Sequence, residues 1–202
     1  MLRLGITGGI ASGKSVVSSM LRELGFQVID ADRLAHQLTE PGQGAYDELV
    51  EEFGPGILAP DRRVDRTALA ALVFADRAKL ERLNAIVHPR VEAATFEQFS
   101  EWQRAGMLDA AFVEAALLVE AGFHRRLDGL VVAWCRPEQQ LERLTARGFS
   151  EAEARMRIAS QMPVEEKLRH ATERIDCSGT LRETRREVEA LAAKLRSRPS
   201  NS

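Results

Sequence analysis

The sequence predicts an α/β fold in which helices flank a parallel β-sheet. Short apolar runs suited to buried strands alternate along the chain with longer segments whose apolar residues recur at helical spacing. A glycine-rich loop at residues 8–15 joins the first apolar run directly to the first helical segment. With 202 residues, the chain can bury a full core, as one elaborated domain or as two small ones.

The composition narrows the class of protein further. An apolar content of 45% and a charged content of 29% are ordinary for a globular protein, and a net charge of −2 gives no bulk attraction to nucleic acid or to an anionic membrane. Cys135 and Cys177 form no C-x-x-C pair, and the four histidines show no metal-ligand spacing. We therefore expect a cytoplasmic protein with no signal peptide, membrane span, disulfide scaffold or zinc site.

Residues 8–15 match the pattern G-x-x-x-x-G-K-[ST], which is typical of loops that bind phosphate. A strand is predicted before the loop, over Leu2–Thr7, and a helix after it, over residues 16–24. Glycines allow successive N–H groups to point at one anion, and the helix N-terminus adds about half a positive charge there. Lys14 is expected to reach the β- and γ-phosphates of a nucleoside triphosphate, and Ser15 to hold Mg²⁺. The alternative is a flexible glycine turn with a surface lysine.

A second strand is predicted over residues 26–29, and it runs into Asp30-Ala31-Asp32. Ligands of open parallel sheets bind beyond the carboxyl ends of the strands, where this acidic pair falls. Asp32 is therefore a candidate for the carboxylate that orients an acceptor hydroxyl in phosphoryl transfer. The alternative is that Asp32 caps a helix beginning near Arg33.

Residues 33–105 are predicted to be mostly helical, with breaks where Gly and Pro cluster at 41–44 and 54–61. This segment is too long for a simple crossover between strands, so it predicts a helical insertion that binds the acceptor. Within it, His88-Pro89 is expected to open a helix, because proline suits the first turn. The stripe of Phe99 and Trp102 is interpreted as core and not as a platform for stacking bases.

Two more strands are predicted over residues 108–113 and 127–134, and the continuous apolar centre of the second is typical of a buried parallel strand. The first is not followed by the aspartate that often marks a magnesium-binding strand. Glu114 and Glu120 are the nearby candidates, with a solvated surface carboxylate as the alternative for each. Cys135 is expected to be a small buried residue.

The segment 136–174 is predicted to be helical, and its balanced charge is typical of a solvated, salt-bridged surface. Individual arginines of such a segment can still clamp phosphates, and a lid of this length suits a phosphoryl-transfer enzyme. A short fifth strand is predicted over residues 174–177. An amphipathic helix is predicted to close the chain, with its apolar face formed by Leu181, Val188, Leu191 and Leu195.

These motifs, in their order along the chain, resemble those of bacterial dephospho-coenzyme A kinases. The similar segments are LGITGGIASGKS at 4–15, VIDAD at 28–32, LNAIVHP at 83–89, LLVE at 117–120, QLERL at 140–144 and RIASQ at 157–161. The phosphate loop alone occurs in many families, whereas this ordered set spans nearly the whole chain and is specific.

The resemblance implies a P-loop fold of the nucleoside-monophosphate-kinase type with a five-stranded parallel sheet. It implies one domain with a core of residues 1–32, 106–136 and 172–202, a helical dephospho-CoA-binding insertion at 33–105 and a lid at 137–171. The implied activity is ATP-dependent, Mg²⁺-supported phosphorylation of the ribose 3′-hydroxyl of dephospho-CoA, the last step of coenzyme A biosynthesis. The implied protein is a cytoplasmic monomer or small homo-oligomer with no nucleic-acid or membrane partner.

The resemblance also assigns site residues by position. Asp32 matches the presumed base, Lys14 and Arg143 are further catalytic residues, and Ser15 is the metal ligand. Asp32, His88 and Glu120 are assigned to the acceptor. The predicted ATP-binding residues are Gly8, Gly9, Ile10, Ala11, Ser12, Gly13, Lys14, Ser15 and Val16.

The chain departs from the family pattern at four positions. Ala116 replaces a usual proline, and Thr172 and Cys177 replace a common aspartate and asparagine, which leaves the contacts to adenine unassigned. Ala11 replaces a frequent loop glycine, a change that is tolerable if its φ is negative.

Three rival functions are weighed against this one. The runner-up is a P-loop kinase for another small acceptor, such as a nucleoside or nucleotide. A GTP-dependent switch protein needs an N-K-x-D segment, but neither asparagine of the chain, Asn84 or Asn201, precedes a lysine. A non-catalytic nucleotide-binding module is disfavoured by the presence of Lys14, Ser15 and Asp32.

Overall fold

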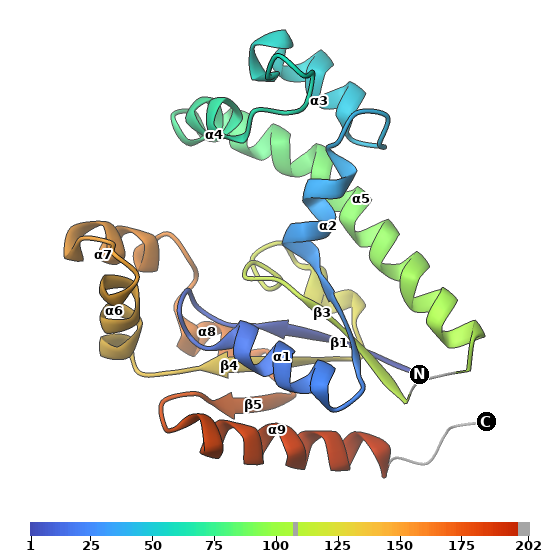
Figure 1. The fold of residues 1–202 in the computed structure, drawn as a ribbon, viewed down its shortest axis with the longest axis vertical. Coiled ribbons are helices and arrows are strands. Elements are labelled where there is room, and N and C mark those ends of the chain that lie inside the picture. The colour runs from blue at the N-terminus through green and yellow to red at the C-terminus, as the bar shows by residue number, and fades with distance from the viewer. Residues whose placement is uncertain (107–108, 198–202) are drawn as a thin grey trace. The chain divides into compact units, whose positions relative to one another are not determined.

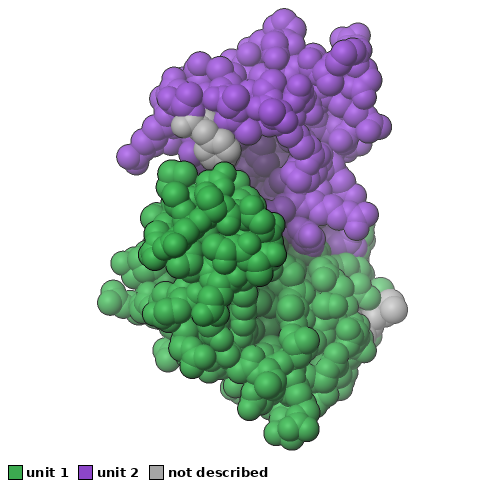
Figure 2. Space-filling model, turned by 60° about the vertical axis from the view of Figure 1, so that its left-hand side comes forward, with its two compact units in different colours: residues 1–29, 101–202 green, residues 30–100 purple. Residues whose placement is uncertain are grey.

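The computed structural model describes residues 1–106 and 109–197. The chain divides into two compact units: residues 1–29 and 101–202 form unit 1, and residues 30–100 form unit 2 (Figure 2). In the described parts of the chain, no helix is both long enough and apolar enough to cross a membrane.

Unit 1 is built on a five-stranded parallel sheet with the strand order β2-β3-β1-β4-β5 (Figure 1). Its strands are β1 Leu2–Thr7, β2 Gln27–Asp30, β3 Ala110–Glu114, β4 Gly129–Trp134 and β5 Glu173–Asp176. In the centre, Leu4 is paired with Phe112 of β3 and with Gly129 of β4. The predicted fold class and all five strands are confirmed, while Leu108, the predicted start of the third strand, lies outside the described residues.

The helices of unit 1 differ in how their N-termini are capped. They are α1 Lys14–Glu23, α6 Pro137–Ala146, α7 Glu151–Ala159, α8 Val164–Arg169 and α9 Leu181–Arg196, with a 3₁₀ turn at Phe123–Arg126. Two of them start with a capping box, in which a hydroxyl and a glutamate three residues later satisfy each other's amides: Ser150 with Glu153, and Thr180 with Glu183.

The core of unit 1 lies between the sheet and the pair α1 and α9, which run side by side along it (Figure 1). Alternate residues of the central strands, such as Ile6 and Phe112, are buried against Val17 of α1 and Val188 of α9. The predicted face of the closing helix is confirmed except at its first residue. Leu181 is 68% exposed, and the buried face of α9 begins one turn later, at Thr184.

Unit 2 is helical, as predicted. Its elements are α2 Ala31–Leu38, α3 Tyr46–Phe53, a 3₁₀ turn at Pro55–Ile57, α4 Arg66–Phe74 and most of α5 Arg77–Arg104, which continues into unit 1. Leu49, Leu69 and Ile86 meet in a core of their own. Arg90 of α5 ties the loop before α3 to this core, because its Nε donates to the carbonyl oxygen of Gly44 at 2.6 Å.

The prediction that His88-Pro89 opens a helix is wrong. The helix α5 begins at Arg77, where the carboxylate of Asp76 accepts a hydrogen bond from the amide of Ala78 at 2.9 Å, and it continues through Pro89. An interior proline lacks an N–H donor and is tolerated when tertiary packing outweighs the lost bond. The interpretation of Phe99 as core is confirmed, since its side chain is fully buried.

Candidate functional site

The loop between β1 and α1 has the geometry of a phosphate cradle. A Cβ atom at Gly8 would lie 2.3 Å from the carbonyl oxygen of Ala133, and one at Gly13 would lie 2.7 Å from Cβ of Cys177. Gly13 also has a φ of 105° and precedes α1 without a side-chain cap. Glycine is therefore required at both positions, and the predicted order of strand, loop and helix is confirmed.

Most of the loop's amides are open. Among the described residues, none accepts a hydrogen bond from the backbone N–H of Ala11, Gly13, Lys14 or Ser15. These groups lie at the N-terminus of α1, where the helix dipole adds a partial positive charge. A run of open N–H donors at such a place is a site for a polyphosphate.

The condition set on Ala11 is not met, because its φ is +58°. This left-handed conformation costs a residue with a Cβ about 1 kcal/mol or more relative to glycine. Two contacts hold the loop in this shape. Arg143 donates through Nη1 to the carbonyl oxygen of Ala11 at 3.0 Å, and Gln140 donates to that of Ile10 at 2.7 Å.

A buried carboxylate faces the start of α1. Glu114, the last residue of β3, accepts a hydrogen bond on Oε1 from Nζ of Lys14 at 2.5 Å and from the hydroxyl of Ser15 at 3.2 Å. Its side chain is 7% exposed, and Arg22 lies 3.9 Å from its other oxygen. Two cations thus balance the charge of a carboxylate that would otherwise be costly to bury.

Glu114 is the functional candidate that the sequence reasoning undervalued. The signal was present, since four apolar residues precede it in the strand Ala110–Glu114. A glutamate in place of the expected aspartate reaches one methylene further, and the structure brings it to the two loop residues predicted to bind phosphate and metal, Lys14 and Ser15.

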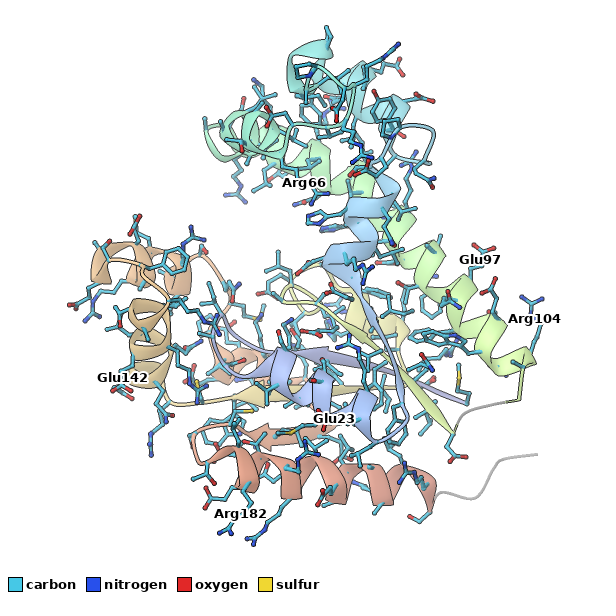
Figure 3. The ribbon with its side chains drawn as sticks, in the orientation of Figure 1. Glu23, Arg66, Glu97, Arg104, Glu142 and Arg182 are labelled. Atoms are coloured by element: carbon cyan, nitrogen blue, oxygen red, sulfur yellow. The ribbon has the colours of Figure 1, made fainter. Side chains whose placement is uncertain are left out.

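Three residues of the segment 137–171 hydrogen-bond to the backbone of the loop. Besides Gln140 and Arg143 of α6, Gln161 in the connection between α7 and α8 accepts a hydrogen bond from the amide of Ile10 at 2.8 Å. Arg143 also donates through Nη2 to the carbonyl oxygen of Cys177 at 2.6 Å. Its neighbour Glu142 is exposed and points away from the sheet (Figure 3). The predicted arginine is therefore at the loop, with its guanidinium bound to backbone carbonyls.

Glu120 belongs to a second buried cluster. Its Oε1 lies 2.8 Å from Nζ of Lys167, whose side chain is completely buried, and accepts a hydrogen bond from the amide of Met162 at 3.1 Å. Lys167 also donates to the carbonyl oxygen of Ala116 at 2.6 Å, and the hydroxyl of Thr7 donates to the same oxygen. Glu120 is exposed to solvent, as its alternative expected, and it is also held by the buried ammonium of Lys167. Lys167 had no signal in the sequence because it sits in a charged helix.

Asp32 and His88 lie in unit 2, whereas the other predicted site residues belong to unit 1. The helix cap proposed for Asp32 is wrong. Asp30 is the N-cap residue of α2, because its carboxylate accepts a hydrogen bond from the amide of Arg33 at 2.9 Å. Asp32 is an exposed residue in the first turn. Burial lowers the pKa of His88, which favours its neutral form.

The departures from the family pattern have structural counterparts. Thr172 holds the start of β4, because its hydroxyl accepts from the amide of Leu130 at 2.9 Å. Cys177 is buried against Gly13 of the phosphate loop. Ala116 presents its carbonyl oxygen to the Lys167 cluster, so the turn after β3 is held without a proline.

The donor set suits a magnesium ion that arrives with a nucleotide. Ser15 and Glu114 offer a hydroxyl and a carboxylate side by side, which are hard oxygen ligands. Among the described residues, no three His, Cys, Asp or Glu side chains gather as a metal cluster. Magnesium bound to nucleotides needs no such cluster, because phosphate oxygens and waters complete its shell.

Comparison with known proteins identifies the relatives of this site. A sequence profile of the dephospho-CoA kinase family matches residues 2–183. The chain is 47% identical over 188 residues to dephospho-CoA kinase of Symbiobacterium thermophilum (93% of this chain, 78% of that protein), and 45% identical over 192 residues to that of Geobacter sulfurreducens (95% and 97%). A solved dephospho-CoA kinase from Campylobacter jejuni aligns with a TM-score of 0.73 at 29% identity, covering 96% of each chain. The chain belongs to the dephospho-CoA kinase family.

Proposed function

We propose that this protein transfers the γ-phosphoryl group of ATP to the ribose 3′-hydroxyl of dephospho-CoA, which completes coenzyme A in the cytoplasm. The observation that carries this proposal is the cradle of open amides beside Lys14 and Ser15 at the start of α1. Family membership supports dephospho-CoA as the acceptor. A phosphate cradle alone supports any nucleotide-dependent kinase, so the acceptor rests on the family.

The donor side of the reaction is assigned to unit 1. Residues 8–16 bind the phosphates through the loop's open amides, and Lys14 exchanges its hydrogen bond to Glu114 for one to the β- and γ-phosphates. Ser15, with Glu114 beside it, holds the magnesium ion. When bound, that ion neutralises charge on the transferred group. Arg143 keeps the loop in its strained shape, and in this way preorganises the donors for the transition state.

The acceptor side is assigned to Asp32, His88 and Glu120. Asp32 orients the 3′-hydroxyl and accepts its proton. Because the transition state of phosphoryl transfer is loose, the main task of this base is to hold the hydroxyl in line with the phosphoryl group. His88, in the insertion 33–105, offers a neutral imidazole as hydrogen-bond partner for the acceptor. Glu120 acts through the loop after β3, which it ties to the lid 137–171.

Water must be kept from the phosphoryl group, or ATP is hydrolysed instead of transferred. The direct test follows ADP formation from Mg-ATP with and without dephospho-CoA, and with a panel of nucleosides and nucleotides in its place. We expect rapid ADP formation with dephospho-CoA and at least a hundredfold less without an acceptor. Equal rates without any acceptor, or a faster reaction with another member of the panel, would contradict the proposal.

A further inference from the structure

The amide of Ile10 is occupied by a side chain of another segment, whereas that of Ser12 donates within the loop, to the carbonyl oxygen of Gly9. Its N–H donates to Oε1 of Gln161 at 2.8 Å, whereas the amides of Ala11, Gly13 and Lys14 have no acceptor among the described residues. The carboxamide oxygen of Gln161 thus stands where the cradle would receive an oxygen of a ligand. A neutral carbonyl oxygen binds an N–H more weakly than an anionic phosphate oxygen does.

We infer that Gln161 substitutes for a phosphate oxygen while the loop is empty, and that a bound nucleoside triphosphate displaces it. The inference rests on the proposed function, because it needs a polyphosphate in the cradle. Gln161 is then a positioning residue: it binds the loop when no nucleotide is present, and its hydrogen bond to Ile10 is lost when a nucleotide binds. The exchange is favourable because a charge-assisted bond replaces a neutral one.

The surroundings of Gln161 allow its side chain to leave without moving the whole lid. It lies in the short connection between α7, which ends at Ala159, and α8, which begins at Val164. The next residue, Met162, is fixed by the hydrogen bond that its backbone N–H donates to Glu120, and Glu120 is itself held by the buried Lys167. The backbone after Gln161 is therefore anchored, so its side chain can leave the amide of Ile10 while Met162 and α8 stay in place.

The carbonyl group of Ile10 is held independently of its N–H group. Gln140 donates to the carbonyl oxygen of Ile10 at 2.7 Å, and its side chain is buried. The loop therefore keeps its shape when Gln161 leaves, so that the amide of Ile10 becomes available in place. This separates the two glutamines: Gln140 supports the loop, and Gln161 competes with the ligand for it.

The test compares Gln161→Met with Gln161→Glu, using the non-hydrolysable magnesium complex of adenylyl imidodiphosphate as the probe. Methionine fills similar volume without an acceptor, so the competing bond is lost and affinity should rise by about two- to tenfold. Glutamate binds the amide of Ile10 as an anion and repels phosphate, so affinity should fall by about tenfold or more. Changes of affinity in opposite directions for the two variants are expected only if Gln161 competes with the phosphate.

Gln139→Met is the matched control, because Gln139 of α6 donates to the carbonyl oxygen of Ser178 and makes no bond to the phosphate loop. Its affinity should stay within about twofold of the wild type. Hydrogen exchange of the Ile10 amide gives a second readout: it should be protected in the free wild type and exchange faster in free Gln161→Met. If Gln161→Met binds the probe equally or more weakly, the inference fails while the proposed function stands. If the wild type does not bind the probe, both fail.

Discussion

Asp30 and Asp32 are separated by one residue and are assigned different tasks. The carboxylate of Asp30 caps α2, whereas Asp32 is exposed in the first turn and makes no cap. Asparagine caps helices about as well as aspartate but cannot accept a proton. Replacing Asp32 by asparagine therefore tests the proposed base, and the same replacement at Asp30 is the matched control.

We predict that Asp32→Asn lowers turnover by about 10²- to 10⁴-fold with little change in ATP affinity, the loss typical of an acid–base residue. Asp30→Asn should retain turnover within a few-fold, because the cap survives. Steady-state kinetics with both substrates varied, together with ATP binding by calorimetry, measure the two effects. Near-normal turnover of Asp32→Asn would remove the catalytic assignment.

The two thiols beside the phosphate loop are predicted to be inert in the native protein. Burial raises the pKa of Cys177 to about 12, and burial also raises the pKa of Cys135, so neither forms the reactive thiolate near neutral pH. At pH 8 a disulfide reagent such as Ellman's should modify neither residue within the time in which it titrates both after unfolding. Rapid reaction of the native protein would show that the strand ends open.

At the residue scale, the sequence motif located the phosphate loop but not the conformation or partners of its members. Lys14 and Ser15 lie where the motif places them, whereas the positive φ of Ala11 depends on bonds from Gln140 and Arg143, which are remote in sequence. A motif describes neighbours along the chain. The grip of the lid on the loop is a tertiary property, so no spacing rule predicts it.

At the scale of the elements, the Glu120–Lys167 pair joins the loop after β3 to α8. The ammonium of Lys167 has no exposed surface, and Glu120 and the carbonyl oxygen of Ala116 are its partners. Removing one member of a buried ion pair strands the other charge, which costs about 3–5 kcal/mol in full burial. Glu120 is partly exposed, so the two single substitutions should differ.

Glu120→Gln is predicted to lower the free energy of unfolding by about 3 kcal/mol, because the buried ammonium loses its counter-charge. Lys167→Met should cost less, since the carboxylate left behind reaches water, and the double variant should be more stable than Glu120→Gln alone. Urea unfolding of the wild type, the two single variants and the double variant measures this double-mutant cycle. Additive losses would show that the two groups do not interact.

Elements with strong local signals were predictable, and those governed by distant packing were not. The five strands and the helix that follows the phosphate loop were predicted from periodicity and are confirmed. The prediction at His88-Pro89 was wrong because a proline is interpreted locally as a helix start, while α5 already begins at Arg77, after the capping carboxylate of Asp76. Helix length here depends on tertiary contacts that periodicity does not contain.

For the whole molecule, the residues that we propose for the reaction are divided between the two units. Unit 1 carries the phosphate loop with Lys14, Ser15 and Glu114, and unit 2 carries Asp32 and His88. Asp32 follows β2 almost immediately, so the chain leaves the sheet at the residue proposed as base.

The most direct test of the proposed function is to locate the transferred phosphate in the product. The protein is incubated with Mg-ATP and dephospho-CoA, the product is analysed by phosphorus NMR and mass spectrometry, and Lys14→Met serves as the inactive control. We predict one new phosphate, on the ribose 3′-hydroxyl, and none with Lys14→Met. A phosphate at another position, or equal transfer by Lys14→Met, would contradict the account.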